Sequence, residues 1–342
     1  MLGALISLFF LLVFSEFSSA NFKRLAPILE AWDASKRLPN QEEPKLALPW
    51  NGGWAKGAAL LWALGSSIPL LAFSLACHLF LKDKAIASNL MLGSMIGSNV
   101  IALSLALGMI LVAGPITFFR LRTMTSPVFL LLATVAFSYA CLNYRISRWE
   151  GAFLLLLSVG YGFYFRSYSS EWKYFERNHP NESILESSDG LLPIFAFFCL
   201  GLGFFVLALG SAYPFVLWIY EYVSGGIVSD TKAAVHLVAF LLSTPWLIRS
   251  LLSLRESTTG RALTLTSLTH SCMLNVLFLP GIMALIWGST LAPRLLSLDI
   301  PVLLVYTGIF VSVLLIEKES GRILTALLIV SYLLYTGLGV LL

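Results

Sequence analysis

Long apolar segments separated by short polar links recur along the whole chain. Ten such segments are bounded by charged residues or by glycine and proline, and they cover residues 2–20, 54–81, 85–119, 124–143, 150–166, 191–223, 232–253, 262–290, 300–316 and 323–342. An apolar stretch of about 20 residues is long enough for a helix to cross a bilayer. The pattern therefore predicts an all-α membrane protein with about ten transmembrane helices.

The two halves of the chain carry matching residues at a nearly constant spacing. The matches include Pro69 with Pro245, Ser98 with Ser271, and Arg148 with Arg322, which are between 173 and 176 positions apart. An offset close to half the chain length indicates an internal duplication. Because five helices is an odd number, the second copy must be inverted in the membrane, as in many secondary transporters. We predict five-helix repeats at 1–166 and 191–342, joined by a polar linker at 167–190.

The charged residues support the membrane class and predict how the chain is oriented in the bilayer. Only 12% of the 342 residues are charged, about half the share in soluble proteins, which excludes a soluble enzyme. With the N-terminus outside, 16 of the 22 Lys and Arg fall on the cytoplasmic side, as the positive-inside rule requires. We therefore expect the 167–190 linker to be cytoplasmic. The short links favour a bacterial inner membrane.

The first apolar segment is expected to be retained as a helix. It ends in small residues, as a cleaved signal peptide would, but no Lys or Arg precedes it, whereas Lys23 and Arg24 follow it. These flanks favour a membrane helix with its N-terminus outside.

The sequence offers little for other classes of function. The four cysteines are dispersed within apolar segments, and no nucleophile, base and orienting group occur together. No clustered basic face suits a nucleic acid. We expect no enzymatic activity and no cofactor, and we expect the lipid bilayer and small inorganic cations as partners; the sequence leaves the oligomeric state open.

Two runs in the first half combine a proline with hydroxyl and small residues. The first is Gly65-Ser66-Ser67-Ile68-Pro69, and the second is Gly93-Ser94-Met95-Ile96-Gly97-Ser98-Asn99. Proline removes a helical hydrogen bond, and lipid cannot satisfy the freed carbonyl. Glycines four residues apart let a second helix approach closely. We therefore predict a broken helix packed on a small-residue helix, with hydroxyls and an amide at mid-membrane.

These runs resemble the alpha repeat of the calcium/cation antiporter superfamily, the sodium/calcium exchanger membrane-region fold. That repeat reads G-[ST]-S-x-P-E, followed by G-N-x-x-G-S-N-x-x-N. In the second half, His270-Ser271-Cys272-Met273-Leu274-Asn275 stands in the place of G-S-N-x-x-N and keeps its serine and final asparagine. The resemblance covers essentially the whole chain and implies a cation antiporter that works by alternating access between inverted halves.

The sequence departs from the repeat at the two glutamates that the resemblance would make calcium ligands. Leu70 follows Pro69 and Trp246 follows Pro245. None of the 18 Asp and Glu residues lies within 57–81, 85–113, 232–252 or 262–288, the four helices that would build the site. Calcium usually takes six to eight oxygens that include carboxylates. We therefore expect calcium selectivity to be altered or lost.

The candidate ion pathway consists of neutral polar residues and one histidine. These residues are Ser66, Ser67, Ser98, Asn99, Ser243, Thr244, His270, Ser271 and Asn275. The serines and Thr244 either line the pathway or bond to helix carbonyls around the proline breaks. Asn99 is either a ligand or an interhelical hydrogen-bonding group. His270 is either a proton relay or a neutral histidine that bridges helices.

Two functions remain open from the sequence. In the leading hypothesis the chain is an exchanger-type antiporter that carries Na⁺, K⁺, H⁺ or Ca²⁺. In the alternative it is a non-transporting relative that keeps the fold as a membrane scaffold or partner subunit. A polar, solvated centre would favour transport, whereas a dry, apolar centre would favour the scaffold.

Overall fold

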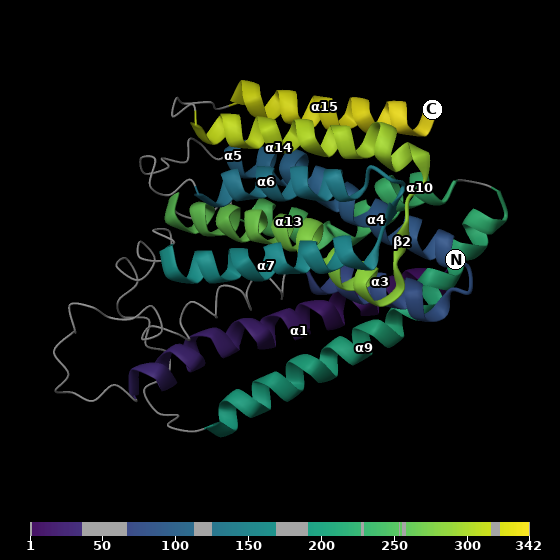
Figure 1. The fold of residues 1–342 in the computed structure, drawn as a ribbon. Helices are drawn as coiled ribbons and strands as arrows, with labels where there is room; N and C mark the ends of the chain where they lie inside the picture. Colours follow the sequence, from purple (N-terminus) through teal and green to yellow (C-terminus); the bar gives the residue numbers. More distant parts are fainter. Residues whose placement is uncertain are drawn as a thin grey trace.

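The computed structural model describes residues 2–35, 67–112, 125–168, 191–226, 229–252, 254, 258–315 and 322–341. Each of the ten apolar segments coincides with a helix or a broken helix (Figure 1). The uninterrupted helices are α1 (Leu2–Ser35), α3 (Ile68–Phe80), α6 (Thr125–Ala140), α7 (Arg148–Tyr168), α9 (Leu191–Ser224), α13 (Thr258–Trp287) and α15 (Arg322–Leu341). The fold is all-α, as predicted.

Three of the ten helices contain a π-helical turn. The third helix consists of α4 (Lys84–Ile101), η1 (Ala102–Ala106) and α5 (Leu107–Val112), and η4 (Leu295–Asp299) leads into α14 (Ile300–Leu315). The most broken one runs through α10 (Asp230–Lys232), η2 (Ala233–Val238), α11 (Ala239–Leu242) and α12 (Thr244–Leu252). Such turns occur often at functional sites because they disturb the regular backbone bonding.

Several helices have the length and apolar character of membrane spans. Among the described residues, four are long and apolar enough to cross a membrane, and the bent α10–α12 helix raises the number to five. Shorter apolar helices occupy 2–18, 68–80, 126–140 and 325–337. Together with α7 (Arg148–Tyr168), these helices form a multi-pass integral membrane protein in two inverted five-helix repeats.

Burial separates the central helices from the peripheral ones. In an apolar 18-residue window of the span Lys84–Val112, 83% of the residues are buried, whereas only 28% are buried in the corresponding window of Phe198–Ser224. Helices α1 and α9 lie side by side along the edge of the bundle (Figure 1) and are joined by a bond from the Ser18 hydroxyl to the Gly201 carbonyl, 2.7 Å long. The third helix is thus central, while α9 exposes most of its apolar surface as a lipid-facing helix would.

The central crossing brings α4 against the broken helix of the other half. A β-carbon added at Gly93 would lie 2.7 Å from that of Ala234, and one at Gly97 would collide with the Val235 carbonyl. The broken helix bends by 42° between Leu242 and Thr244, immediately before Pro245. The close approach of small residues is therefore present, and a break of the predicted kind lies before Pro245 in the second half. The break predicted for the first-half run is not seen in the described residues, because Pro69 lies in the first turn of α3 and residues 54–66 fall outside them.

A short antiparallel β-pair joins the halves at one end of the bundle. Strand β1 (Arg145–Ile146), between α6 and α7, pairs with β2 (Ser289–Thr290), between α13 and α14. The Leu291 amide also donates to the Tyr144 carbonyl at 2.8 Å. These bonds fix one end of the first half against the matching end of the second.

Candidate functional site

Four serines of the candidate pathway form two hydrogen-bonded pairs across the halves. The Ser67 hydroxyl oxygen lies 3.2 Å from that of Ser271, and the Ser98 hydroxyl oxygen lies 2.8 Å from that of Ser243. Ser67 matches Ser243 in the repeat, and Ser98 matches Ser271, so each pair is the symmetry copy of the other. In each pair a residue beside a proline break meets a residue on the small-residue helix of the other half.

The two asparagines extend this crossing through their amide groups. The side-chain amide of Asn99, on α4, donates to the Cys272 carbonyl on α13 at 2.9 Å. The amide of Asn275 donates to the Asn99 side-chain oxygen, also at 2.9 Å. Within the described part of the chain, the Asn275 side-chain oxygen has no hydrogen-bond partner. The crossing thus offers one neutral oxygen that is available to a ligand.

Thr244 and Ser66 stand apart from the paired serines. The Thr244 hydroxyl donates to the Phe240 carbonyl one turn earlier, at 3.3 Å. This bond covers a carbonyl at the break in the helix, which is the alternative role considered for these hydroxyls. Ser66 lies outside the described residues, so its prediction stays open.

His270 bridges two helices of different halves. Its Nδ1 atom lies 2.6 Å from the Tyr161 hydroxyl on α7, and that hydroxyl is 3.4 Å from the Ser126 hydroxyl at the start of α6. The two helices approach closely, since a β-carbon added at Gly151 would be 2.9 Å from the Gly281 carbonyl. This geometry has the form of the helix-bridging histidine.

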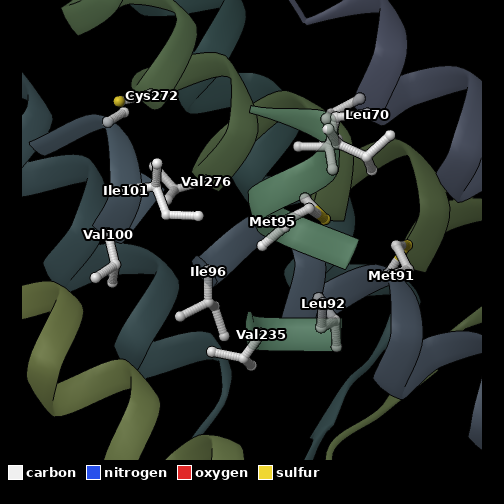
Figure 2. Close-up of a cluster of buried hydrophobic side chains, with 14 of the residues drawn as sticks. Leu70, Met91, Leu92, Met95, Ile96, Val100, Ile101, Val235, Cys272 and Val276 are labelled. Atoms are coloured by element: carbon white, nitrogen blue, oxygen red, sulfur yellow. The ribbon is translucent and has the colours of Figure 1, made fainter. Parts of the chain in front are cut away.

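Apolar side chains occupy the two positions after the prolines. Leu70 and Trp246 are only 4% and 8% exposed. Figure 2 shows Leu70 in a buried cluster that includes Met95, Ile96 and Val235. Acidic side chains are absent from 68–80, 84–112 and 258–287, and Asp230 at the outermost turn of α10 is the one acidic residue of 230–252. These helices therefore bring no carboxylate to the crossing, and the guanidinium of Arg249 lies 6.0 Å from the Trp246 ring.

Sequence reasoning missed two partners at this crossing. The Cys272 carbonyl accepts from Asn99, but a backbone acceptor leaves no trace in residue identity. Tyr161 is matched by Tyr335 at an offset of 174, but only the packing of α7 on α13 pairs it with His270.

Matching halves, a broken helix and hydroxyl pairs at the crossing are features that secondary transporters with inverted repeats share. Residues 57–166 match the model of the family described as sodium/calcium exchanger protein. A search among curated proteins gave no match.

Solved exchanger structures match nearly the whole chain at low sequence identity. The sodium-calcium exchanger NCX_Mj, soaked with 100 mM Na⁺ and 10 mM Sr²⁺, has 16% identity and a TM-score of 0.58, over 97% of this chain and 95% of the other. An H⁺/Ca²⁺ exchanger CAX has 12% identity and a TM-score of 0.66, over 97% and 80%. This chain therefore has the fold of these exchangers.

Proposed function

We propose that this protein is a cation antiporter of the exchanger type that works by alternating access and whose central site takes a monovalent cation or a proton instead of calcium. The observation that carries the proposal is the crossing itself. Hydroxyls and amides from both halves meet there, and the Asn275 side-chain oxygen has no hydrogen-bond partner. Fold similarity to Na⁺/Ca²⁺ and H⁺/Ca²⁺ exchangers supports the antiporter class.

Charge favours a monovalent ion. A divalent ion in a low-dielectric site needs carboxylates to offset its charge, and an uncompensated ion is very costly to bury. Leu70 and Trp246 remove the two positions nearest to the crossing that could supply them. Neutral oxygens from Ser67, Ser98 and Asn275 suit an ion of single charge, provided that the serine pairs open.

The pathway residues in this proposal are the predicted set. They are Ser66, Ser67, Ser98, Asn99, Ser243, Thr244, His270, Ser271 and Asn275. The serine pairs suit alternating access because each joins the two halves. If one serine pair breaks while the other stays bonded, the crossing opens toward one side of the membrane. If the other pair breaks instead, it opens toward the opposite side.

We also propose the domain boundaries and the orientation. The repeats are 1–166 and 191–342, the cytoplasmic linker is 167–190, and the N-terminus is outside, in a bacterial inner membrane. A single cysteine at Ser187 in the linker should react with a membrane-impermeant reagent only from inside, and one at Thr290 in β2 only from outside, in a variant without the native cysteines. Labelling of both from the same side would contradict this orientation.

A second candidate function has two specific observations in its favour. The serine hydroxyls bond to each other, and Leu70 is packed in a buried apolar cluster. A centre that never opened would look the same, and the chain would then serve as a membrane scaffold or partner subunit.

Ion flux into proteoliposomes separates the two functions. The purified protein is reconstituted, and sodium, potassium, proton and calcium gradients are imposed in turn. The antiporter proposal expects exchange of a monovalent ion or proton and loss of that exchange in Asn275→Ala, whereas Gly160→Ala on exposed α7 surface serves as the matched control. Absence of flux for every ion under conditions in which a known exchanger works would support the scaffold.

A further inference from the structure

Three helix ends of the second half meet at the end of the bundle that carries the β-pair. They are the first turns of the α10–α12 helix, the η4 turn before α14, and the last turns of α15, and Figure 1 places α10, β2 and the C-terminus at this end. They bring together Asp299, Arg294, His236 and Tyr335, which we call the Asp299 cluster. None of these residues belongs to the candidate pathway.

Asp299 is fully buried, and its carboxylate is incompletely satisfied. The side chain is 0% exposed. The Tyr335 hydroxyl donates to Oδ1 at 2.7 Å, whereas Oδ2 has no hydrogen-bond partner in the described structure. The nearest cation is Arg294, whose Nε lies 3.9 Å from Oδ2. A terminal nitrogen of Arg294 instead donates to the Gly339 carbonyl at 2.8 Å.

A second orphaned titratable group lies beside the same tyrosine. The His236 and Tyr335 rings have centroids 5.2 Å apart. Both ring nitrogens of His236 are buried and without a hydrogen-bond partner among the described residues. The His236 ring packs directly on Gly339, because a β-carbon added at Gly339 would collide with Nε2 of the ring. Buried polar groups are normally hydrogen-bonded, so unsatisfied atoms on both Asp299 and His236 call for an explanation.

The backbone around both groups is also unusual. His236 lies on the π-helical turn η2 and Asp299 on the π-helical turn η4. Single π-helical turns inside α-helices are frequent at functional sites. This observation is independent of the hydrogen bonds and points to the same two residues.

We propose that Asp299 and His236 form a proton-binding site that exchanges with the aqueous phase at this end of the membrane. A proton on Oδ2 neutralises a carboxylate that Arg294 compensates only at long range, and the ionised form keeps the Tyr335 bond, so the cluster accommodates both states. His236, only two turns from the start of its helix at Asp230, passes the proton between solvent and carboxyl.

The other charged and titratable groups near this site come from few elements. Arg294 and Tyr335 touch Asp299, Lys232 precedes His236 by one turn, and Tyr306 and Tyr332 lie on α14 and α15. Helix α4, which packs on both η2 and η4, has no titratable residue from 85 to 101, and neither η1 nor α5 has one. Lys84 begins α4, and Asp230, on α10 beside η2, is the one other carboxylate of these elements, so the test must separate its proton uptake from that of Asp299 and His236.

Infrared difference spectroscopy tests this site directly on the full-length protein in lipid. As the pH is lowered through the range in which carboxyl and imidazole groups titrate, the wild type should gain the carbonyl band of a protonated, buried carboxylic acid. Asp299→Asn should lose that band. Asp230→Asn should keep it, because Asp230 is partly exposed and accepts a bond from Asn89 at 2.6 Å.

Two further variants keep the test decisive if Asp299→Asn folds poorly. Tyr335→Phe should shift the midpoint of the titration, since it removes the hydrogen bond that the tyrosine donates to Oδ1 of Asp299. His236→Gln should turn a coupled two-group titration into a single one. A band that persists in Asp299→Asn, or no band at any pH in the wild type, would overturn the proposal. The readout needs no ion flux, so it stands or fails apart from the proposed antiport.

Discussion

Tyr161 and Tyr335 hold matching places in the two halves, yet they contact different chemistry. Tyr161 lies near Ser126 and His270, whereas Tyr335 donates to the buried carboxylate of Asp299. Asp299 follows Ser126 by 173 positions, so the repeat has a hydroxyl in one half and an acid in the other. The serine pairs at the crossing, by contrast, are alike in both halves.

The two tyrosines show that some positions of an inverted repeat must stay matched between the halves, whereas others can differ. Residues at the crossing contact the other half, so a change in one copy disturbs the bond made by its partner in the second. Asp299 and its partners Arg294 and Tyr335 all lie in the second half, so they can change without a matching change in the first. Among the described residues, the protein keeps symmetric serine pairs at the crossing and carries its buried carboxylate away from it, in the second half only.

The largest expected effect comes from placing a charge at the crossing. Leu70→Glu should lower the free energy of unfolding by about 3–5 kcal/mol, the cost of an unpaired buried charge, and added calcium should reverse part of the loss. Thermal unfolding in detergent with and without calcium measures both, and Leu70→Gln is the neutral control of the same shape. Equal stability of the Glu and Gln variants without calcium would show that the crossing tolerates charge as Asp299's surroundings do.

The next effect concerns the close contact of α4 with the broken helix, because the matching position in the other half has a different residue. Gly97 and His270 hold matching positions, 173 apart, and only Gly97 faces a backbone carbonyl at contact. Gly97→Ala should cost about 1–3 kcal/mol through overpacking. Gly160→Ala, at an exposed helical glycine with nothing within 4 Å, should be neutral or stabilise by about 0.5–1 kcal/mol. Similar unfolding midpoints for the two variants would contradict the tight crossing.

The asparagines should differ because they do not repeat. Asn99 makes two hydrogen bonds, to Cys272 and from Asn275, and Ala102 holds the place that matches Asn275. Asn99→Ala should cost about 1–3 kcal/mol by leaving buried groups unsatisfied, and Asn275→Ala less. Chemical unfolding gives the order, and the reverse order would show that Asn99 is not the centre of this network.

The smallest effect is the most direct test of symmetry. Double-mutant cycles on Ser67 with Ser271 and on Ser98 with Ser243 should give coupling energies of about 0.5–1.5 kcal/mol each. Because the pairs are copies, the two values should agree within about 0.5 kcal/mol. A clear coupling for one pair and none for the other would mean that the crossing is asymmetric in solution.

Much of the fold follows from the sequence because hydrophobic length and proline placement act locally. The ten segments and the break before Pro245 are confirmed. The length of α1 was underestimated, since the apolar stretch stops at 20 while the helix runs to Ser35. A helix can continue past its apolar part where polar side chains reach water, so hydropathy marks the span and not the helix end.

The candidate site was less predictable, because its contacts join residues far apart in the chain. The repeat offset indicated that Ser67 matches Ser243 and Ser98 matches Ser271. It did not indicate that Ser67 bonds to Ser271 and Ser98 to Ser243, since that pairing depends on how the two inverted halves cross. Asp299 drew no attention in the sequence because it stands between apolar residues at the start of a span, where acidic residues are usually exposed.

The sequence by itself determined the membrane class, the helices, the duplication and the loss of both glutamates, because each rests on residue type and spacing. Only the tertiary structure decided which polar atoms bond to each other and which remain unsatisfied. Hydrogen bonds depend on atoms brought within about 3 Å by packing, and neither spacing nor composition contains that distance. The paired serines, the free oxygen of Asn275 and the orphaned atoms of Asp299 and His236 are visible only in the folded protein.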